Sequence, residues 1–181
     1  SSDLVEQARS RIWLIDSKGL IFNTRDDFIS HKMAHHKLPY AHALTPEMQA
    51  VIAKFGELKT QDDILLSAIE AVQPSGLIGV SAQGQTFTRN VIELMSRINA
   101  NPLIFALSNP TSKSECSAAE AYTYSNGKAV FASGSPFDPV TLPDGRTLIP
   151  GQGNNAYIFP GVGLGVVVSG AWRGGPGRAT L

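Results

Sequence analysis

Short apolar runs alternate with longer amphipathic stretches through the middle of the chain. The runs at 77–80, 102–107 and 129–132 are bounded by turn residues, which is typical of buried strands. Between and before them, residues 60–72 and 87–98 carry apolar side chains at helical spacing. Successive strand, helix and strand segments form a parallel, right-handed crossover. The pattern therefore predicts an α/β fold, with a Rossmann-like parallel sheet and helices on both faces.

Local signals mark where further elements begin. Thr60 is a cap for the first amphipathic helix, and the sequence Ser-Ala-Ala-Glu at 117–120 is a capping box for another short one. Residues 140–149 resemble a hairpin around a Pro-Asp-Gly turn. After the glycine-rich segment 150–161, an apolar helical stretch is expected to run to about Ala171.

The N-terminal segment has a pattern that is typical of dinucleotide-binding folds, an expected strand that ends in an acid. A helix-like stretch at 3–10 precedes the apolar run 11–16, which is expected to be a buried strand ending in Asp16. In dinucleotide-binding folds, an acid at the end of the second strand accepts hydrogen bonds from the adenine ribose, although Asp16 is equally explained as turn chemistry. The glycine fingerprint lies about 20 residues before such an acid, and no G-x-G-x-x-G precedes Asp16. We therefore expect an incomplete fold whose first strand and glycine fingerprint lie upstream.

Ligands of open α/β sheets bind at the carboxyl edge of the strands. Asn109 is followed by a proline that ends the strand 102–107, so it should begin a loop with a free amide. The small residues of the turn 81–84 should lie on the same edge and let a flat ligand approach the backbone. A simple turn or cap is the alternative for both. Asn154 and Asn155 precede the last helix and could place amides on a carboxylate or carboxamide.

All four histidines fall in the polar segment 23–45. His31 and His35 have the i, i+4 spacing of a metal-binding pair, but no carboxylate or cysteine stands at convincing ligand spacing. We interpret the segment as a solvated loop or helix face. Lys32 and Lys37 could meet a cofactor 2′-phosphate near Asp16, or could be ordinary surface lysines.

Composition and charge exclude several classes of protein. The chain has 181 residues, enough for one domain, and a formal net charge of zero, which gives no sign of a nucleic-acid partner. It has neither an apolar run of about 18 residues nor a signal-peptide pattern, so neither a membrane span nor a signal peptide is expected. The single Cys116 fits a reducing compartment and is expected to be a small packing residue.

Five separated motifs together resemble the cofactor-binding domain of malic enzymes, in the family's order. They are IWLIDSKGLI (12–21), LIGVSAQGQTFT (77–88), FALSNPTSKSEC (105–116), ASGSPFDPVTLPDGR (132–146) and PGQGNNAYIFPGVGLGV (150–166). The resemblance extends over residues 1–171, which we expect to be a partial NAD(P)-binding domain. Residues 172–181 do not resemble the family's continuing helix and are expected to be an aberrant or flexible tail. Gln85 stands where the family usually has glycine.

The resemblance implies oxidation of malate with NADP or NAD, decarboxylation of the oxaloacetate and release of pyruvate, assisted by Mg²⁺ or Mn²⁺. It implies that Asn109 and Asn154 bind malate, with Asn155 beside them near the nicotinamide. The implied cofactor contacts are Asp16, Ser17, Lys18, Lys32, Val80, Ser81, Ala82, Asn109 and Asn154. The family's catalytic tyrosine and lysine and its acidic metal ligands lie upstream. No catalytic residue or metal ligand is therefore expected here, and the chain is expected to be inactive by itself.

The choice of cofactor stays open on the residues alone. Asp16 favours NAD because it repels a 2′-phosphate, whereas some NADP-using relatives share the D-S-K-G start and rely on a later lysine, for which Lys32 is suitably placed. We expect NADP or NAD, with a preference for NADP. In the full-length enzyme we expect a homo-oligomer, in the cytoplasm or in an organelle matrix where a targeting segment lies upstream.

Two alternatives remain at this stage. The first is another dinucleotide enzyme, such as an amino-acid dehydrogenase, which would lack the set Asn109, Asn154 and Asn155. The second is a non-catalytic dinucleotide-binding or oligomerisation module. A sheet without its first strand exposes an edge that tends to pair with another chain.

Overall fold

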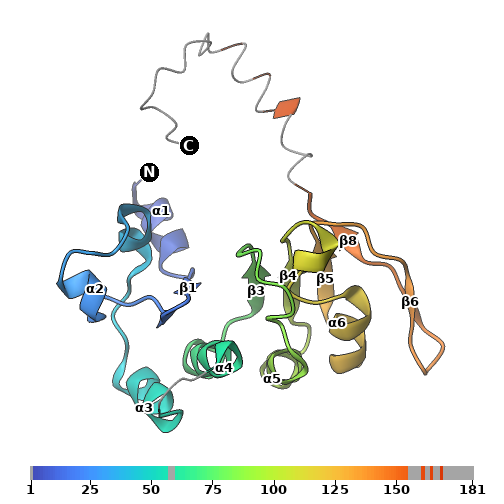
Figure 1. Ribbon diagram of the computed structural model, residues 1–181, viewed down its shortest axis with the longest axis horizontal. Helices are drawn as coiled ribbons and strands as arrows, with labels where there is room; N and C mark the ends of the chain where they lie inside the picture. Colours follow the sequence, from blue (N-terminus) through green and yellow to red (C-terminus); the bar gives the residue numbers. More distant parts are fainter. Residues whose placement is uncertain (1, 57–59, 155–159, 162–163, 165–167, 169–181) are drawn as a thin grey trace.

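A four-stranded parallel sheet forms the centre of the computed structural model, which describes residues 2–56, 60–154, 160–161, 164 and 168 (Figure 1). The strands stand in the order β3-β4-β5-β8. Their bounds are β3 Gly76–Gly79, β4 Leu103–Ala106, β5 Val130–Ser133 and β8 Gly151–Gln152. The predicted α/β class, with a parallel sheet flanked by helices, is confirmed.

The three predicted strands pair in register over their full length. Gly79 pairs with Ala106, and Ala106 pairs with Ser133, so the three strands end at one level. Strand β8 was not predicted, and it adds a parallel edge through Gly151. A side chain at Gly151 would begin 3.2 Å from the carbonyl oxygen of Phe131, so the small residue lets β8 approach closely.

Three helices lie in a row along this sheet (Figure 1). They are α4 Gln61–Val72, α5 Arg89–Ile98 and α6 Ala118–Tyr124. The capping box expected at Ser117 is present at the start of α6, and Thr60 and Asp63 form another at the start of α4. The Thr88 hydroxyl caps α5. The predicted cap at Thr60 and the predicted capping box at Ser117 are therefore confirmed, and the cap at Thr88 is an addition.

Alternate strand residues face the helices and form the core. Leu77, Ile104 and Phe131 are buried there, together with Cys116, whose predicted packing role is confirmed. Two right-handed crossovers that advance in the same direction place α5 and α6 on one face of the sheet. On the other face Ile78 is 66% exposed, and the described helices do not cover it. The second helical layer of the prediction is thus not found among the described residues.

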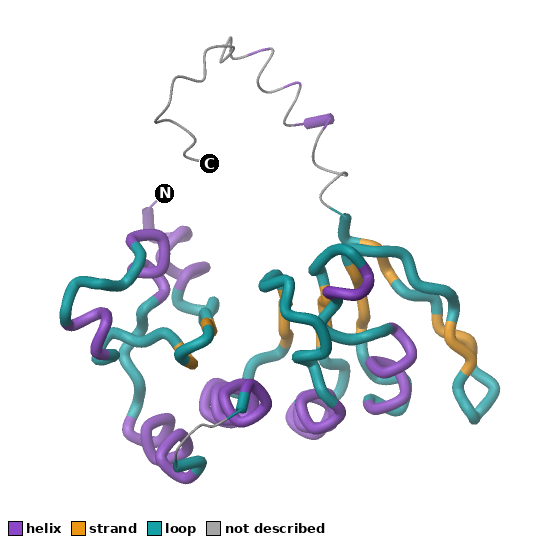
Figure 2. The backbone as a smooth tube through the Cα atoms, viewed as in Figure 1, coloured by secondary structure: helices purple, strands orange, loops and turns teal. Residues whose placement is uncertain are grey.

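The N-terminal part consists of short helices and a two-stranded hairpin, joined by loops (Figure 2). Its elements are α1 Ser2–Arg9, β1 Ile15–Asp16, β2 Gly19–Leu20, α2 Asp26–Ile29, η1 His35–Tyr40 and α3 Pro46–Lys54. The expected buried strand over 11–16 is wrong. Only its last two residues form a strand, which pairs antiparallel with β2 in a tight hairpin. A short apolar run does not specify its partner, and here the local turn supplies one.

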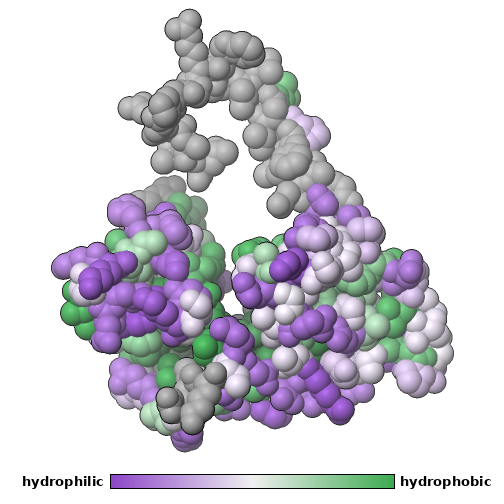
Figure 3. All heavy atoms as spheres, in the orientation of Figure 1, coloured by the Kyte–Doolittle hydropathy of each residue, from purple (hydrophilic) through white to green (hydrophobic). Residues whose placement is uncertain are grey.

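The polar segment 23–45 lies mostly at the surface, as predicted. Hydrophilic side chains cover much of this part of the molecule in the space-filling view (Figure 3). His31 and His35 are exposed, whereas Met33 is buried and anchors the segment.

The hairpin predicted over 140–149 is confirmed as β6 Val140–Thr141 and β7 Thr147–Leu148. Gly145 has a φ of +86° in its turn, a conformation that suits glycine. Most of the apolar stretch expected to run to Ala171, and all of the tail 172–181, lies outside the described residues. Within the described part of the chain, no helix is long and apolar enough to span a membrane.

Candidate cofactor and substrate site

Loops from all four strands of the sheet meet at its carboxyl edge. Because the strands are parallel and end at one level, the residues after each strand fall side by side. These loop residues are Val80, Ser81 and Ala82 after β3, Ser108 and Asn109 after β4, Gly134 and Ser135 after β5, and Asn154 after β8. The edge thus collects the amide and small-residue positions that the sequence singled out.

Asn109 begins its loop at the end of β4, as predicted, but its amide is not free. Its Oδ1 accepts a hydrogen bond of 2.7 Å from the Ser135 hydroxyl, and its Nδ2 lies 3.4 Å from the Leu107 carbonyl oxygen. The expectation of a free amide fails because the neighbouring loop after β5 brings a hydroxyl within reach. The peptide bond between Asn109 and Pro110 is cis.

Asn154 reaches the same loop from the other side. Its Nδ2 donates to the Gly134 carbonyl oxygen at 3.0 Å. A side chain at Gly134 would begin 2.3 Å from the Leu107 carbonyl oxygen and 2.6 Å from Nδ2 of Asn109, so only glycine fits there. The structure therefore brings Asn109 and Asn154 together around one short segment. Asn155 lies outside the described residues.

The turn after β3 presents an exposed small-residue surface. Val80, Ser81 and Ala82 are all exposed. Ala82 has a φ of +55°, which alanine rarely adopts, and its backbone N–H donates to the Ser108 hydroxyl at 2.9 Å. The hydrogen bond ties this turn to the loop that carries Asn109. These three residues of the turn are thus exposed at the carboxyl edge, and the approach of a flat ligand to their backbone stays a prediction.

Beneath this edge lies a carboxylate that the sequence reasoning missed. Glu115 is only 1% exposed, and its Oε1 accepts from the Ser108 hydroxyl at 2.5 Å. A glutamate in the polar stretch Ser-Lys-Ser-Glu is ordinarily solvated, so no local signal indicates its burial. Gly79 at the end of β3 is the one indirect sign, since a side chain there would begin 2.3 Å from Cδ of Glu115.

A charged cluster surrounds Asp16 in the N-terminal part of the chain. Arg25 binds both carboxylate oxygens of Asp16, at 2.9 and 3.0 Å, and Lys37 binds Oδ2 at 2.6 Å. Burial opposes ionisation of Asp16, but the hydrogen bonds from Arg25 and Lys37 outweigh it and hold the pKa of Asp16 well below its ordinary range. Asp16 is therefore ionised at neutral pH and already paired.

Further charges extend this cluster. Arg25 also binds Asp27 at 2.7 Å, and Lys18 lies 3.5 Å from the same carboxylate. Three cations, Lys18, Arg25 and Lys37, thus face two carboxylates, a local excess of one positive charge. Arg25 was missed in the sequence because its contact with Asp16, nine positions away, depends on the turn between β1 and β2.

Lys32 occupies a different place from Lys37. It lines a surface depression of about 440 Å³ together with Lys18, Arg25, Asp26, Asp27 and Ser30. The contact with Asp16 is made by Lys37. Ser17 follows Asp16 in the exposed turn between β1 and β2, where the Lys18 backbone N–H donates to Asp16 at 3.0 Å.

Comparison with known proteins assigns this arrangement to a family. The family described as "Malic enzyme, NAD binding domain" matches residues 2–174 of the chain. The chain belongs to the malic enzyme family. This membership overturns the alternative of an amino-acid dehydrogenase.

Several curated relatives of this malic enzyme domain are plant proteins. The chain is 50% identical to the NADP-dependent malic enzyme 4, chloroplastic, of Arabidopsis thaliana, 52% identical to NADP-dependent malic enzyme 1 of the same plant, and 51% identical to an NADP-dependent malic enzyme of Populus trichocarpa. Each match covers 93% of this chain and between 23% and 26% of the relative. The chain therefore spans about a quarter of the length of these relatives.

Among the histidines of the malic enzyme domain, His42 makes structural contacts. His42 shares a hydrogen bond of 2.9 Å with the Ile12 carbonyl oxygen and packs edge-on against Trp13. Within the described ranges, no three His, Cys, Asp or Glu side chains gather as a metal site would require. Burial raises the pKa of the Cys116 thiol, which keeps it protonated.

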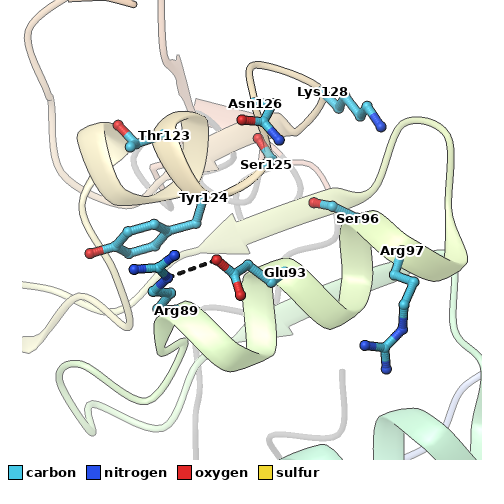
Figure 4. Close-up of a pocket in the computed structure, with 9 residues that line it drawn as sticks. All are labelled: Arg89, Glu93, Ser96, Arg97, Thr123, Tyr124, Ser125, Asn126 and Lys128. Carbon is cyan, nitrogen blue, oxygen red and sulfur yellow. Dashed lines mark hydrogen bonds and ion pairs between the residues drawn. The ribbon is translucent and has the colours of Figure 1, made fainter.

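A surface depression of the malic enzyme domain lies away from the carboxyl edge of the sheet. Figure 4 shows it between α5 and α6, where Arg89 stacks over the ring of Tyr124 and pairs with Glu93. Its volume is about 490 Å³, and none of the predicted site residues lines it. The candidate site is therefore defined by the sheet edge and the Asp16 cluster.

Proposed function

We propose that this domain binds malate and NADP within a longer malic enzyme, which oxidises malate, decarboxylates the oxaloacetate and releases pyruvate. The observation that carries the proposal is the convergence of Asn109 and Asn154 on the loop after β5, at the edge where α/β sheets bind ligands. Names of the relatives, all NADP-dependent malic enzymes, support it.

The Asp16 cluster supports NADP rather than NAD. An acid that selects NAD must offer its oxygens to the ribose hydroxyls, but both oxygens of Asp16 are bound by Arg25 and Lys37. The local excess of one positive charge suits the added 2′-phosphate, for which arginine and lysine are the usual ligands. Lys37 is the lysine best placed for this role, and Lys18 and Lys32 border the same region.

The two asparagines would orient malate. A neutral amide donates to a carboxylate and accepts from a hydroxyl, so a pair of amides can hold an α-hydroxy acid in one orientation. When bound, the nicotinamide ring supplies the acceptor for the hydride of malate C2. Asn109 is pre-oriented by Ser135 before any ligand arrives, which reduces the entropy lost on binding.

The remaining parts of the proposal concern the longer protein. Its catalytic tyrosine and lysine and the ligands of Mg²⁺ or Mn²⁺ would lie outside this chain, which we expect to be inactive alone. We infer a homo-oligomer in the cytoplasm or an organelle matrix; two relatives have names that include "chloroplastic". A non-catalytic oligomerisation module is the second candidate, favoured by the uncovered apolar sheet face around Ile78 and Val130.

Substitution of the two asparagines tests the proposal in a full-length malic enzyme that carries this domain. Asn109→Ala and Asn154→Ala should each lower kcat/KM for malate by about 10- to 100-fold, since a hydrogen bond to a charged group contributes about 1.5–3 kcal/mol. Asn101→Ala is the matched control, because Asn101 precedes β4 at the opposite edge and should leave the kinetics unchanged. Normal malate kinetics in both site variants would refute the assignment.

A further inference from the structure

Glu115 is a buried carboxylate that the proposed function does not use. It lies under the carboxyl edge of the sheet, next to β3, where the absence of a side chain at Gly79 makes room for it. A buried carboxylate is costly unless hydrogen bonds compensate its lost hydration. Both of its oxygens face Ser108, whose hydroxyl lies 2.5 Å from Oε1 and whose backbone N–H lies 3.4 Å from Oε2.

Ser108 connects Glu115 to the turn after β3, because its hydroxyl is hydrogen-bonded to both. Its hydroxyl oxygen accepts from the backbone N–H of Ala82 at 2.9 Å, while its hydroxyl hydrogen is given to Glu115. A serine hydroxyl has one hydrogen, so the bond to Glu115 fixes which way the hydroxyl points. With that orientation its lone pair is directed at Ala82. The three groups thus form one chain, from the backbone of Ala82 through Ser108 to Glu115.

The backbone beside Glu115 braces the same turn. The N–H of Gln85 donates to the Ser114 carbonyl oxygen at 3.0 Å, and the N–H of Phe87 donates to the Glu115 carbonyl oxygen at 2.9 Å. Ala82 and Gln85 both have positive φ values, which non-glycine residues adopt only where their surroundings hold them. Glu115 therefore supports the unusual backbone of Ala82 through its side chain and Ser108, while its main chain holds Phe87, which follows the turn.

We propose that Glu115 is a positioning residue that couples the cofactor turn at 81–85 to the substrate amide of Asn109. The inference rests on the proposed function, because it assumes that this turn contacts NADP and that Asn109 contacts malate. Asn109 directly follows Ser108, so a hydroxyl held between Glu115 and Ala82 sets the separation of the two ligand-binding loops. Hydride transfer depends steeply on that separation.

The first test measures whether the hydrogen bonds from Glu115 through Ser108 hold Ala82, and it requires no turnover. In a full-length malic enzyme that carries this domain, without cofactor, hydrogen exchange at the Ala82 amide should become at least about tenfold faster in Ser108→Ala and in Glu115→Ala. Glu115→Gln keeps one acceptor for the hydroxyl and should give an intermediate rate. Glu120→Gln is the matched control, since Glu120 caps α6 through Ser117 and should leave the Ala82 rate unchanged.

The second test measures the effect of Glu115 on hydride transfer, through kcat and the deuterium isotope effect. Glu115→Ala should lower kcat by about 10- to 100-fold and raise the isotope effect with malate deuterated at C2, because hydride transfer becomes slower relative to other steps. A Ser108→Ala, Glu115→Gln double variant should be no worse than Ser108→Ala alone, since both act through one hydroxyl. Glu120→Gln should match the wild type in both readouts.

The outcomes separate this inference from the proposed function. A wild-type enzyme without malate turnover would refute the proposed function, and the exchange rates would still decide whether Glu115 holds the turn. Turnover with wild-type Ala82 exchange in Ser108→Ala and Glu115→Gln would overturn the inference alone. Additive losses of kcat in the double variant would also overturn it, because Glu115 would then act by a route other than the Ser108 hydroxyl. An unchanged isotope effect in a folded Glu115→Ala enzyme would overturn it as well, because hydride transfer would then not depend on Glu115.

Discussion

At the residue scale, the proposed preference for NADP depends on which basic side chain meets Asp16. The sequence does not distinguish Lys37 from Lys32, because both lie in the same polar segment and each precedes an apolar residue. The structure separates them, because Lys37 binds Asp16 whereas Lys32 lines the depression beside Lys18. A matched pair of substitutions can therefore assign the cofactor phosphate to one lysine.

Lys37→Ala should raise KM for NADP by about 10- to 100-fold in a full-length enzyme, since a charge-assisted hydrogen bond contributes about 1.5–3 kcal/mol. KM for NAD should stay nearly constant, because NAD has no 2′-phosphate. Lys32→Ala should change either value by less than about threefold, as expected for a screened surface charge. Steady-state kinetics with both cofactors make the measurement. A larger NADP effect for Lys32→Ala than for Lys37→Ala would reverse the assignment.

At the element scale, helix starts were predictable because capping is local chemistry. The hydroxyl of Thr60 accepts a hydrogen bond from the Asp63 N–H at 3.0 Å. The Asp63 carboxylate in turn accepts one from the Thr60 N–H at 3.1 Å. Buried strands were also predictable, from apolar runs such as 102–107. Strand β8 was not, because Gly151 and Gln152 have no apolar pattern and pair only through the backbone.

Thr60→Ala should lower the free energy of unfolding by about 1 kcal/mol, the usual cost of losing an N-cap. Urea denaturation of the 181-residue chain, followed by circular dichroism, measures the change. Thr123→Ala is the control, since Thr123 is exposed within α6 and its loss should leave stability unchanged or slightly higher. Equal stability of Thr60→Ala and wild type would show that the capping box contributes little to α4.

At the scale of the whole molecule, the sequence motifs predicted the family. They did not predict the contacts between segments that are distant along the chain. The bond between Asp16 and Lys37 joins residues 21 positions apart, and its geometry depends on the intervening loop and short helices. The burial of Glu115, which lies in the loop before α6, depends on Gly79 at the end of strand β3. Apolar periodicity contains no information on such pairings, and it also misassigned the run 11–16 to a buried strand.

The most direct test of the central claim is turnover by a full-length malic enzyme into which residues 2–154 of this chain have been introduced. With malate, NADP and Mg²⁺ or Mn²⁺, we predict equal molar amounts of NADPH and pyruvate, and a loss of at least about tenfold in kcat/KM for malate on Asn109→Ala. Introducing the same segment with Asn101→Ala should leave the rate unchanged. A folded, NADP-binding enzyme that forms no pyruvate from malate would contradict the account.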